Sequence, residues 1–300
     1  MWLSWELTDW GRPVSGYAHT NPEAVRIDAH QHFWKFDPVR DAWIDETMKA
    51  IRRDFGPGDL RPLLQANQID GCVAVQADQS EAETKFLLGL AAENPLIKKV
   101  VGWVDLASPN VEERLAYWKS KEKLAGFRHI LQAEPPEKMD DKAFRHGIAL
   151  LKKYAFTYDI LIFPRHLEAA LRLVDAFPDQ PFVVDHLAKP LIRKRQMEPW
   201  ASMMKQLARR PHVVCKVSGM VTEANLADWQ PEDLRPYMDI VVDAFGPARL
   251  MFGSDWPVCL LAASYERVCR IVDDYFSNFT DTERAQVMGG TAARFYGITN

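Results

Sequence analysis

Short apolar runs rich in β-branched residues recur along the chain and alternate with longer segments of helical periodicity. There are eight such runs, at residues 26–34, 72–78, 100–106, 124–130, 157–163, 181–187, 212–220 and 249–256. Runs of this length that are bounded by turn residues are typical of buried β-strands. We therefore expect eight strands, whose starting points lie roughly 24 to 46 residues apart.

The segments between these runs carry helix signals. Ser80 with Glu83, and Thr280 with Glu283, have the spacing of a capping box, and Pro109 follows Ser108 at a position suited to a first helical turn. A helix over 165–177 is predicted from an apolar stripe, and one over 231–246 ends on a glycine. The stripe is formed by Leu167, Ala170, Leu171, Val174 and Phe177.

Strands that alternate with helices at this spacing predict parallel βαβ units, and eight units in one chain favour a closed (β/α)8 TIM barrel. A doubly wound open sheet is the alternative, but its glycine-rich G-x-G-x-x-G turn is absent after the first strand. We expect one α/β barrel domain over 26–300, preceded by an N-terminal extension over 1–25. The three tryptophans of that extension are expected to pack it onto the body.

Composition and charge narrow the possible partners. The net charge of -4 gives no basic face for nucleic acid, and no apolar run approaches the length of a membrane span. The four cysteines show no C-x-x-C spacing and the N-terminus lacks a signal peptide, which predicts reduced thiols in a cytoplasmic protein. Assembly into a homo-oligomer is left open.

Ionisable residues gather at the carboxyl ends of the predicted strands, where barrel enzymes place their active sites. His30 and His32 alternate in the first strand and so share one face, His186 ends the sixth strand, and Asp255 ends the eighth. A lone strand histidine is more often a core residue, but two on one face favour a functional role. We expect these four residues to meet in one pocket, lined also by Arg128, Lys189, Trp34, Trp103 and Tyr158.

The motifs around these residues resemble the amidohydrolase superfamily and, within it, the sugar-lactonase branch. The resemblance is carried by DAHQHFW, GFRHILQ, DHLAKP, VSGM, FGSDWPV and the closing TAARFYGI, and it covers residues 26 to 300. That branch includes L-fucono- and L-rhamnono-lactonases and relatives of 2-pyrone-4,6-dicarboxylate lactonase. The resemblance implies that this chain hydrolyses a small sugar-acid lactone.

The sequence departs from the two-metal members of that superfamily, which carry a bridging lysine or glutamate on the fourth or fifth strand. Here the corresponding runs are LAGFRHI and TYDILIF, so a binuclear centre is not expected. His30, His32, His186 and Asp255 suffice for one optional zinc or other divalent ion. The branch is thought to need no obligatory metal, and the sequence allows either state.

In the mechanism we expect, Asp255 takes a proton from the attacking water while His30, His32 and His186 orient that water. Arg128 or Lys189 would stabilise the oxyanion, and Trp34, Trp103 and Tyr158 would hold the sugar ring. The main alternative is a mononuclear zinc decarboxylase or amide hydrolase of the same superfamily. A non-catalytic barrel, and an aldolase using Lys216, are weaker alternatives.

Overall fold

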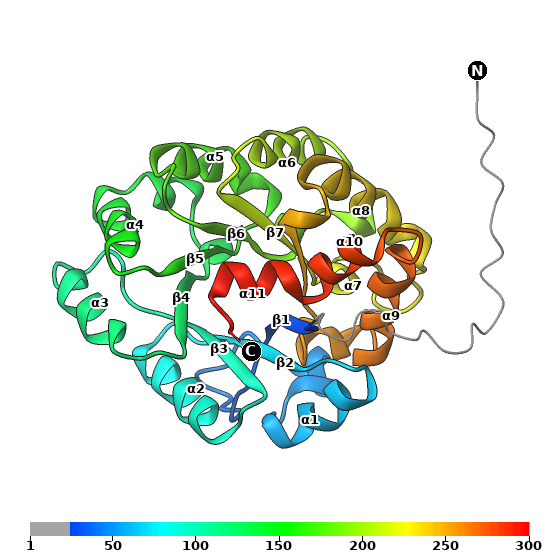
Figure 1. The fold of residues 1–300 in the computed structure, drawn as a ribbon, viewed down its shortest axis with the longest axis horizontal. Helices are drawn as coiled ribbons and strands as arrows, with labels where there is room; N and C mark the ends of the chain where they lie inside the picture. The colour runs from blue at the N-terminus through cyan, green and yellow to red at the C-terminus, as the bar shows by residue number, and fades with distance from the viewer. Residues whose placement is uncertain (1–24, 300) are drawn as a thin grey trace.

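Eight parallel strands form one sheet in the order of the chain, from β1 to β8 (Figure 1). The computed structural model describes residues 25–299, so the predicted extension over 1–25 lies outside the described residues except for Val25. The strands are β1 Ile27–Gln31, β2 Gly71–Val75, β3 Ile97–Gly102, β4 Leu124–His129, β5 Thr157–Ile160, β6 Phe182–Val184, β7 Val213–Val217 and β8 Leu250–Phe252. Each lies within or beside a predicted run, which confirms the (β/α)8 barrel.

The barrel closes where β8 meets β1. Two backbone hydrogen bonds bridge this seam: Asp255 N donates to His30 O at 2.8 Å, and His32 N donates to Trp256 O at 2.7 Å. The bonds lie beyond the last residue of β8, so the seam is joined mainly at the carboxyl end of the strands. The segments that close the barrel are therefore also those that carry His30, His32 and Asp255.

Most of the helices surround the sheet as an outer layer, whereas α11 lies across the middle of the barrel (Figure 1). The helices are α1 Pro57–Ala66, α2 Glu81–Glu93, α3 Val111–Lys119, α4 Lys142–Lys153, α5 Leu167–Ala176, α6 Trp200–Ala208, α7 Met220–Glu223, α8 Pro231–Phe245, α9 Tyr265–Tyr275, α10 Asp281–Ala285 and α11 Thr291–Tyr296. The Ser80 and Thr280 side chains each accept a hydrogen bond from the backbone three residues on, as predicted. The expected start at Pro109 is wrong, because a turn closed by Val111 N and Ser108 O delays α3 to Val111.

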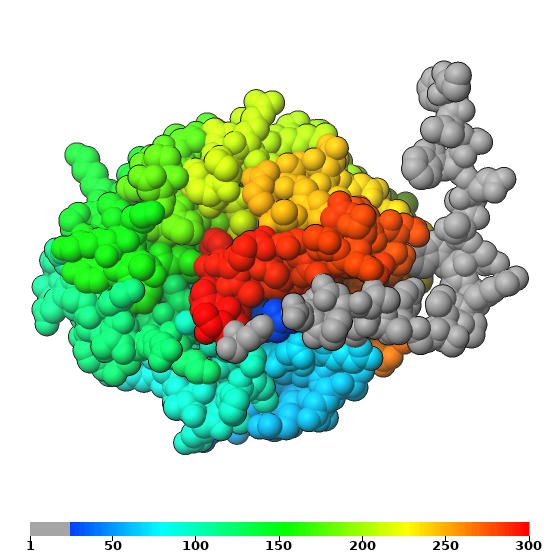
Figure 2. Space-filling view, in the orientation of Figure 1, coloured from blue at the N-terminus to red at the C-terminus, as the bar shows by residue number. Residues whose placement is uncertain are grey.

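Two apolar layers hold the barrel together. The larger fills the space between the sheet and the outer helices, and the smaller fills the barrel interior. The interior layer includes Ile27, Val73, Val101, Val183 and Met251, together with Ala292 and Tyr296 of α11. Helix α11 crosses the middle of the barrel at the end where the strands begin, and the red C-terminal atoms lie over the centre of that face (Figures 1 and 2).

Alternation along the strands therefore places apolar side chains inside the barrel near the strand starts and polar side chains inside it near the strand ends.

The four cysteines are all buried and free, in agreement with the expected reduced thiols. Within residues 25–299, none of the helices combines the length and the apolar character required to cross a bilayer.

Candidate active site

The structure brings together the four residues predicted to form the site. His32 Nε2 lies 3.4 Å from Asp255 Oδ1, His186 Nε2 lies 3.8 Å from the same oxygen, and His30 Nε2 lies 3.9 Å from it. All four side chains are buried, none more than 6 % exposed. They come from the carboxyl ends of β1, β6 and β8, so three imidazoles from two distant strands converge on one carboxylate.

A register shift in β1 separates the Asp28 side chain from the face that His30 and His32 share. The pairing of β1 with β2 is irregular between Asp28 and Gln31. Asp28 leaves the cluster and accepts hydrogen bonds from Ser254 N at 2.9 Å, Ser254 Oγ at 2.6 Å and the Tyr265 hydroxyl at 3.1 Å. It thereby ties β1 to the segment that carries Asp255.

Hydrogen bonds on the far side of two rings aim their other nitrogens at Asp255. His32 Nδ1 lies 2.7 Å from the carbonyl oxygen of Val75, which can only accept, so this nitrogen carries a proton. His186 Nδ1 lies 2.8 Å from Ser218 Oγ. In both rings Nε2 is left facing the carboxylate, as in metal-binding or proton-transferring histidines.

Burial and mutual proximity set the charge states of the cluster. Burial disfavours the charged imidazole and lowers the pKa of His186 to about 4, and it lowers the pKa of His30 well below its usual value. Burial alone would raise the pKa of Asp255, but the rings of His186, His32 and His30 outweigh it and hold that pKa well below its usual range. At neutral pH the cluster therefore presents an ionised carboxylate beside two neutral imidazoles.

The backbone at the site is strained. His186, Leu187, Ala188 and Lys189 form a run with φ between 49° and 57°, and Asp255 has φ of 57°. The left-handed region costs about 1 kcal/mol or more for each residue with a Cβ. Bonds from Trp200 Nε1 to Leu187 O at 2.6 Å and from Lys189 N to His186 O at 2.7 Å hold the run in place. Such strain is common where side chains must be aimed for function.

Gly219 makes room for His186. It has φ of 63°, and a Cβ at this position would lie 2.6 Å from His186 Nδ1. Only glycine meets both the conformational and the steric demand, because its missing Cβ removes both costs. The sequence analysis did not single out this residue, although it stands in the VSGM motif.

A buried ion network lies directly beneath the cluster. Arg128 donates to Asp185 Oδ2 at 3.1 Å and to His30 Nε2 at 3.2 Å. Lys216 pairs with Asp159 Oδ2 at 2.6 Å and with Asp185 Oδ1 at 3.0 Å. Two cations thus balance two carboxylates. Lys216 is held as an ion pair inside the barrel, an arrangement that does not suit the aldolase alternative, which needs a free amine.

The predicted substrate-binding residues differ in how near they lie to the histidine cluster. Arg128 is in the network, and Lys189 pairs with Glu223 at 3.1 Å in a partly buried contact close to His186. Trp103 Nε1 lies 3.3 Å from His129 Nδ1, and Trp34 is buried with Nε1 bonded to Arg53 O. The Tyr158 ring packs edge-on between Phe144 and Phe182, so the structure does not bring it to the cluster. Three polar residues that surround the site, Asp159, Asp185 and Glu223, were not among the predicted site residues.

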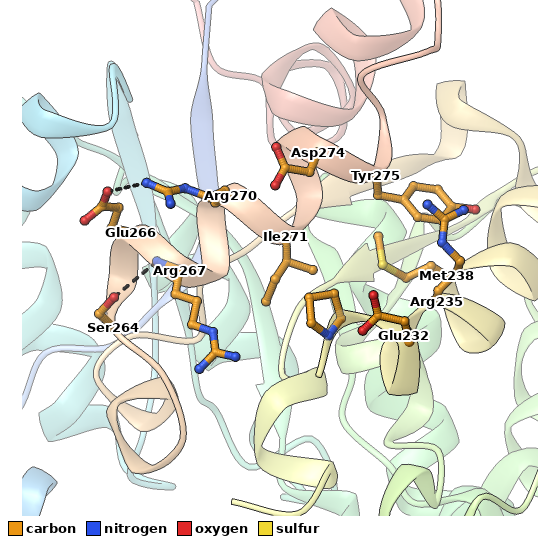
Figure 3. Close-up of a pocket in the computed structure, with 11 residues that line it drawn as sticks. Glu232, Arg235, Met238, Ser264, Glu266, Arg267, Arg270, Ile271, Asp274 and Tyr275 are labelled. Carbon is orange, nitrogen blue, oxygen red and sulfur yellow. Dashed lines mark hydrogen bonds and ion pairs between the residues drawn. The ribbon is translucent and has the colours of Figure 1, made fainter. Parts of the chain in front are cut away.

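A hollow lies outside the barrel between α8 and α9 (Figure 3). Its volume is about 340 Å³, and its lining includes Arg235, Met238, Arg267, Ile271 and Tyr275. The described lining contains neither histidine nor cysteine, and an exposed pair between Glu266 and Arg270 borders it. Hydrolytic chemistry needs groups aimed at one point, and this hollow does not contain such a set.

The donor atoms of the cluster fit a single divalent ion. His30, His32 and Asp255 each offer one ligand atom within 4.8 Å of the others, and His186 Nε2 approaches the same carboxylate oxygen. Neutral imidazoles and a carboxylate are zinc ligands. Arg128 already donates to His30 Nε2, so this nitrogen would have to exchange a hydrogen bond for an ion.

The comparisons with known proteins agree with this geometry. The chain is 42% identical over 290 residues to an L-fucono-1,5-lactonase of Burkholderia multivorans, covering 92% of this chain and 97% of that protein. It is 38% identical to an L-fucono-1,5-lactonase of Burkholderia ambifaria, covering 91% and 96% respectively. A crystal structure of an amidohydrolase from Burkholderia multivorans with bound zinc superposes with a TM-score of 0.88 at 42% identity, covering 92% of this chain and 100% of that one.

The family model described as Amidohydrolase matches residues 27–298, which include every strand of the barrel and all four residues of the cluster. On this match and these identities, the chain belongs to the amidohydrolase family.

Proposed function

We propose that this protein hydrolyses a sugar-acid lactone of the L-fucono-1,5-lactone type to the aldonic acid. The single observation that carries the proposal is the buried, ionised Asp255 with three imidazole nitrogens within 3.9 Å of one of its oxygens. The printed names of the two Burkholderia relatives supply the substrate class. The L-rhamnono-gamma-lactonase of Scheffersomyces stipitis, 23% identical, adds a second sugar lactone to that class.

Lactone hydrolysis requires attack by water, cleavage of the ring ester bond and the transfer of a proton between them, and these residues can carry out the proton transfers. Water attacks the ring carbonyl carbon while Asp255 takes its proton, and the carbonyl oxygen becomes an oxyanion. The bond between the carbonyl carbon and the ring oxygen then breaks, and the departing oxygen takes the proton from Asp255. The low pKa of Asp255 keeps its carboxyl group ionised, but it also makes the carboxylate a weaker base. We therefore assign part of the proton transfer to the Nε2 atoms of His32 and His186.

Positive charge near the cluster supports the developing oxyanion. Arg128 is 3 % exposed and reaches the cluster through His30, and a buried guanidinium stabilises nearby negative charge more than an exposed one does. Lys189 and Glu223 form a donor and acceptor pair suited to the hydroxyl groups of a sugar. Trp34, Trp103 and Tyr158 remain predictions as ring contacts, with Tyr158 the least favoured by its packing.

A divalent ion at the site would be held by His30, His32 and Asp255, once Arg128 releases His30 Nε2, with His186 Nε2 close to the same carboxylate oxygen. When bound, it would polarise the carbonyl oxygen and lower the pKa of a bound water to about 7. No obligatory metal is predicted. Cytoplasmic location and homo-oligomeric assembly also remain predictions.

The test is acid release from a panel of aldono-1,4- and 1,5-lactones, followed with a pH indicator, with and without a chelator. We expect rapid turnover of L-fucono-1,5-lactone or a close stereochemical relative, and Asp255→Asn serves as the matched inactive control. Turnover that survives chelation supports the metal-independent form. No turnover of any lactone in the panel would contradict the proposal.

A mononuclear zinc decarboxylase or amide hydrolase is the second candidate. It is favoured by the donor set that fits one ion and by the similar amidohydrolase crystallised with zinc. This candidate predicts no lactone turnover in the metal-free protein, and release of carbon dioxide or an amine from an aromatic acid or amide after zinc is added. The same panel, extended to these substrates, separates the two candidates.

A further inference from the structure

The C-terminal helix reaches the interior of the barrel through one side chain. Tyr296 of α11 is 3 % exposed and packs in the interior apolar layer. Its hydroxyl donates to Asp159 Oδ2 at 2.8 Å. Figure 1 shows α11 lying across the middle of the barrel. The histidine cluster lies at the opposite end, where the strands finish. The last helix therefore contacts the buried ion network from the end of the barrel where the strands begin.

A continuous chain of contacts leads from that hydroxyl to the active site. Asp159 Oδ2 also binds Lys216 Nζ at 2.6 Å, and Lys216 Nζ lies 3.0 Å from Asp185 Oδ1 and 3.1 Å from His30 Nδ1. The side chains of Lys216, Asp159 and Asp185 have no exposed surface at all. None of the three is used as a base, acid or nucleophile in the proposed mechanism.

The network contacts the His30 ring at both of its nitrogens. Arg128 lies 3.2 Å from His30 Nε2, and Lys216 Nζ lies 3.1 Å from His30 Nδ1. Asp185 Oδ1 lies 3.4 Å from the same Nδ1. Asp185 keeps that position because Lys216 and Arg128 hold it from two sides.

We propose that Tyr296 is a positioning residue for catalysis, acting through Asp159 and Lys216 to hold the His30 ring in its place at the active site. Asp159 Oδ1 has no hydrogen-bond partner in the described part of the chain, so Oδ2 carries both stabilising contacts. Without the tyrosine hydroxyl, the under-solvated carboxylate draws Lys216 away from Asp185 and His30. The kinetic part of this proposal rests on the proposed lactonase function.

The kinetic test compares Tyr296→Phe with Tyr275→Phe. Both variants delete a hydroxyl that donates to an aspartate, but Tyr275 bonds Asp239 Oδ1 at 2.7 Å on the outer helices. For Tyr296→Phe we expect kcat to fall about tenfold with KM changed less than about twofold, because a misplaced catalytic group slows chemistry rather than binding. For Tyr275→Phe we expect both constants to equal those of the wild type. Equal constants in all three proteins would overturn the proposal.

A second readout does not depend on activity. Long-range proton–nitrogen NMR spectra of protein labelled with nitrogen-15 in histidine report the tautomer of each ring, and the His30 signals are assigned by their loss in His30→Asn. We expect Tyr296→Phe to shift the His30 nitrogens while the signals of the outlying His212 stay in place. Unchanged His30 signals contradict the proposal even if the wild type hydrolyses no lactone. Absence of wild-type turnover alone counts against the proposed function, not against this positioning role.

Discussion

The mouth of the barrel and the hollow between α8 and α9 are both lined by arginine and carboxylate side chains, yet they differ in what surrounds those charges. At the mouth, Asp255 is 2 % exposed and Arg128 is 3 % exposed. In the outer hollow, the Glu266 and Arg270 side chains are each 66 % exposed (Figure 3). Water screens the outer charges, whereas the buried charges depend on one another.

The contrast shows that the size of a hollow does not identify a reactive site. The outer hollow offers about 340 Å³, but Glu266 and Arg270 in its lining pair with each other on the exposed surface of α9. At the mouth, a strained backbone holds nitrogens of three imidazole rings within 3.9 Å of one carboxylate oxygen. Desolvation and enforced proximity shift pKa values, and shifted pKa values are what acid–base chemistry uses.

The largest expected difference between the two regions comes from removing one carboxylate charge in each. Asp255→Asn should lower kcat for lactone hydrolysis by about 10³-fold or more, because the base is lost while the shape is kept. Asp274→Asn, which changes a residue lining the outer hollow, should leave kcat unchanged. Circular dichroism should show both variants folded. Near wild-type turnover in Asp255→Asn would remove Asp255 from the mechanism.

Adding a single methyl group should lower kcat at the mouth of the barrel but not at an exposed turn. Gly219→Ala places a Cβ against the His186 ring and should lower kcat by about 10²-fold. Gly297→Ala is the matched control, because its φ of 64° is nearly the same and nothing lies within 4 Å of the added Cβ. Both variants lose about 1 kcal/mol from backbone strain, but only the first should lose activity. Equal kinetics in the two variants would mean that His186 tolerates displacement.

The third prediction concerns pH and Glu83, a buried residue in the first turn of α2. Burial raises the pKa of Glu83 to about 7 from its ordinary value of 4.5. Below the lower value the residue is neutral in both the folded and unfolded chain. Between the two values the unfolded chain releases a proton that the folded chain keeps, so the free energy of unfolding falls as pH rises.

Glu83→Gln removes this penalty and should raise the free energy of unfolding by about 1–3 kcal/mol at pH 8, with no gain near pH 4.5. Glutamine still accepts the bond from Ala77 N, which lies 3.2 Å from Glu83 Oε1. Urea unfolding at both pH values measures the difference. If the variant gained no more stability over the wild type at pH 8 than at pH 4.5, burial would not raise the pKa of Glu83.

The smallest effect is expected in the outer hollow. Arg270 and Glu266 form an exposed pair one helical turn apart at 2.8 Å, and such pairs contribute about 0.3–0.5 kcal/mol. Arg270→Ala should therefore change the free energy of unfolding by less than about 0.5 kcal/mol and leave lactone turnover unaltered. A large loss of activity would mean that the hollow communicates with the mouth, and the contrast between the two regions would fail.

Much of this architecture could be predicted from local patterns. The eight apolar runs predicted the strands, since buried parallel strands need β-branched apolar residues on both faces. The alternation of His30 and His32, together with the strand-end positions of His186 and Asp255, predicted that they would converge. Such inferences succeed because periodicity and strand direction are local properties that a barrel then brings to one end.

The remaining features depend on contacts between segments far apart in the chain. Regular alternation in the first strand predicts that Asp28, His30 and His32 share one face. It does not indicate the register shift, after which Asp28 contacts Ser254 and Tyr265. Tyr158 was predicted to bind the sugar because of its place in the fifth strand, but packing against Phe144 and Phe182 sets its direction. A one-residue change of register reverses the face of a side chain, and this is decided between strands.

The amino-acid sequence by itself determined the barrel, its strand order and the four residues at its mouth, because these follow from hydrophobic period and the parallel direction of the strands. Only the tertiary structure decided that Lys216, Asp159, Asp185 and Arg128 balance one another and that Tyr296 joins them from the last helix. Those pairings join residues up to 137 positions apart. A buried charge is stable only beside a group of opposite charge. In this barrel that group comes from a distant segment of the chain, so the pairing depends on the closed fold and not on the local sequence.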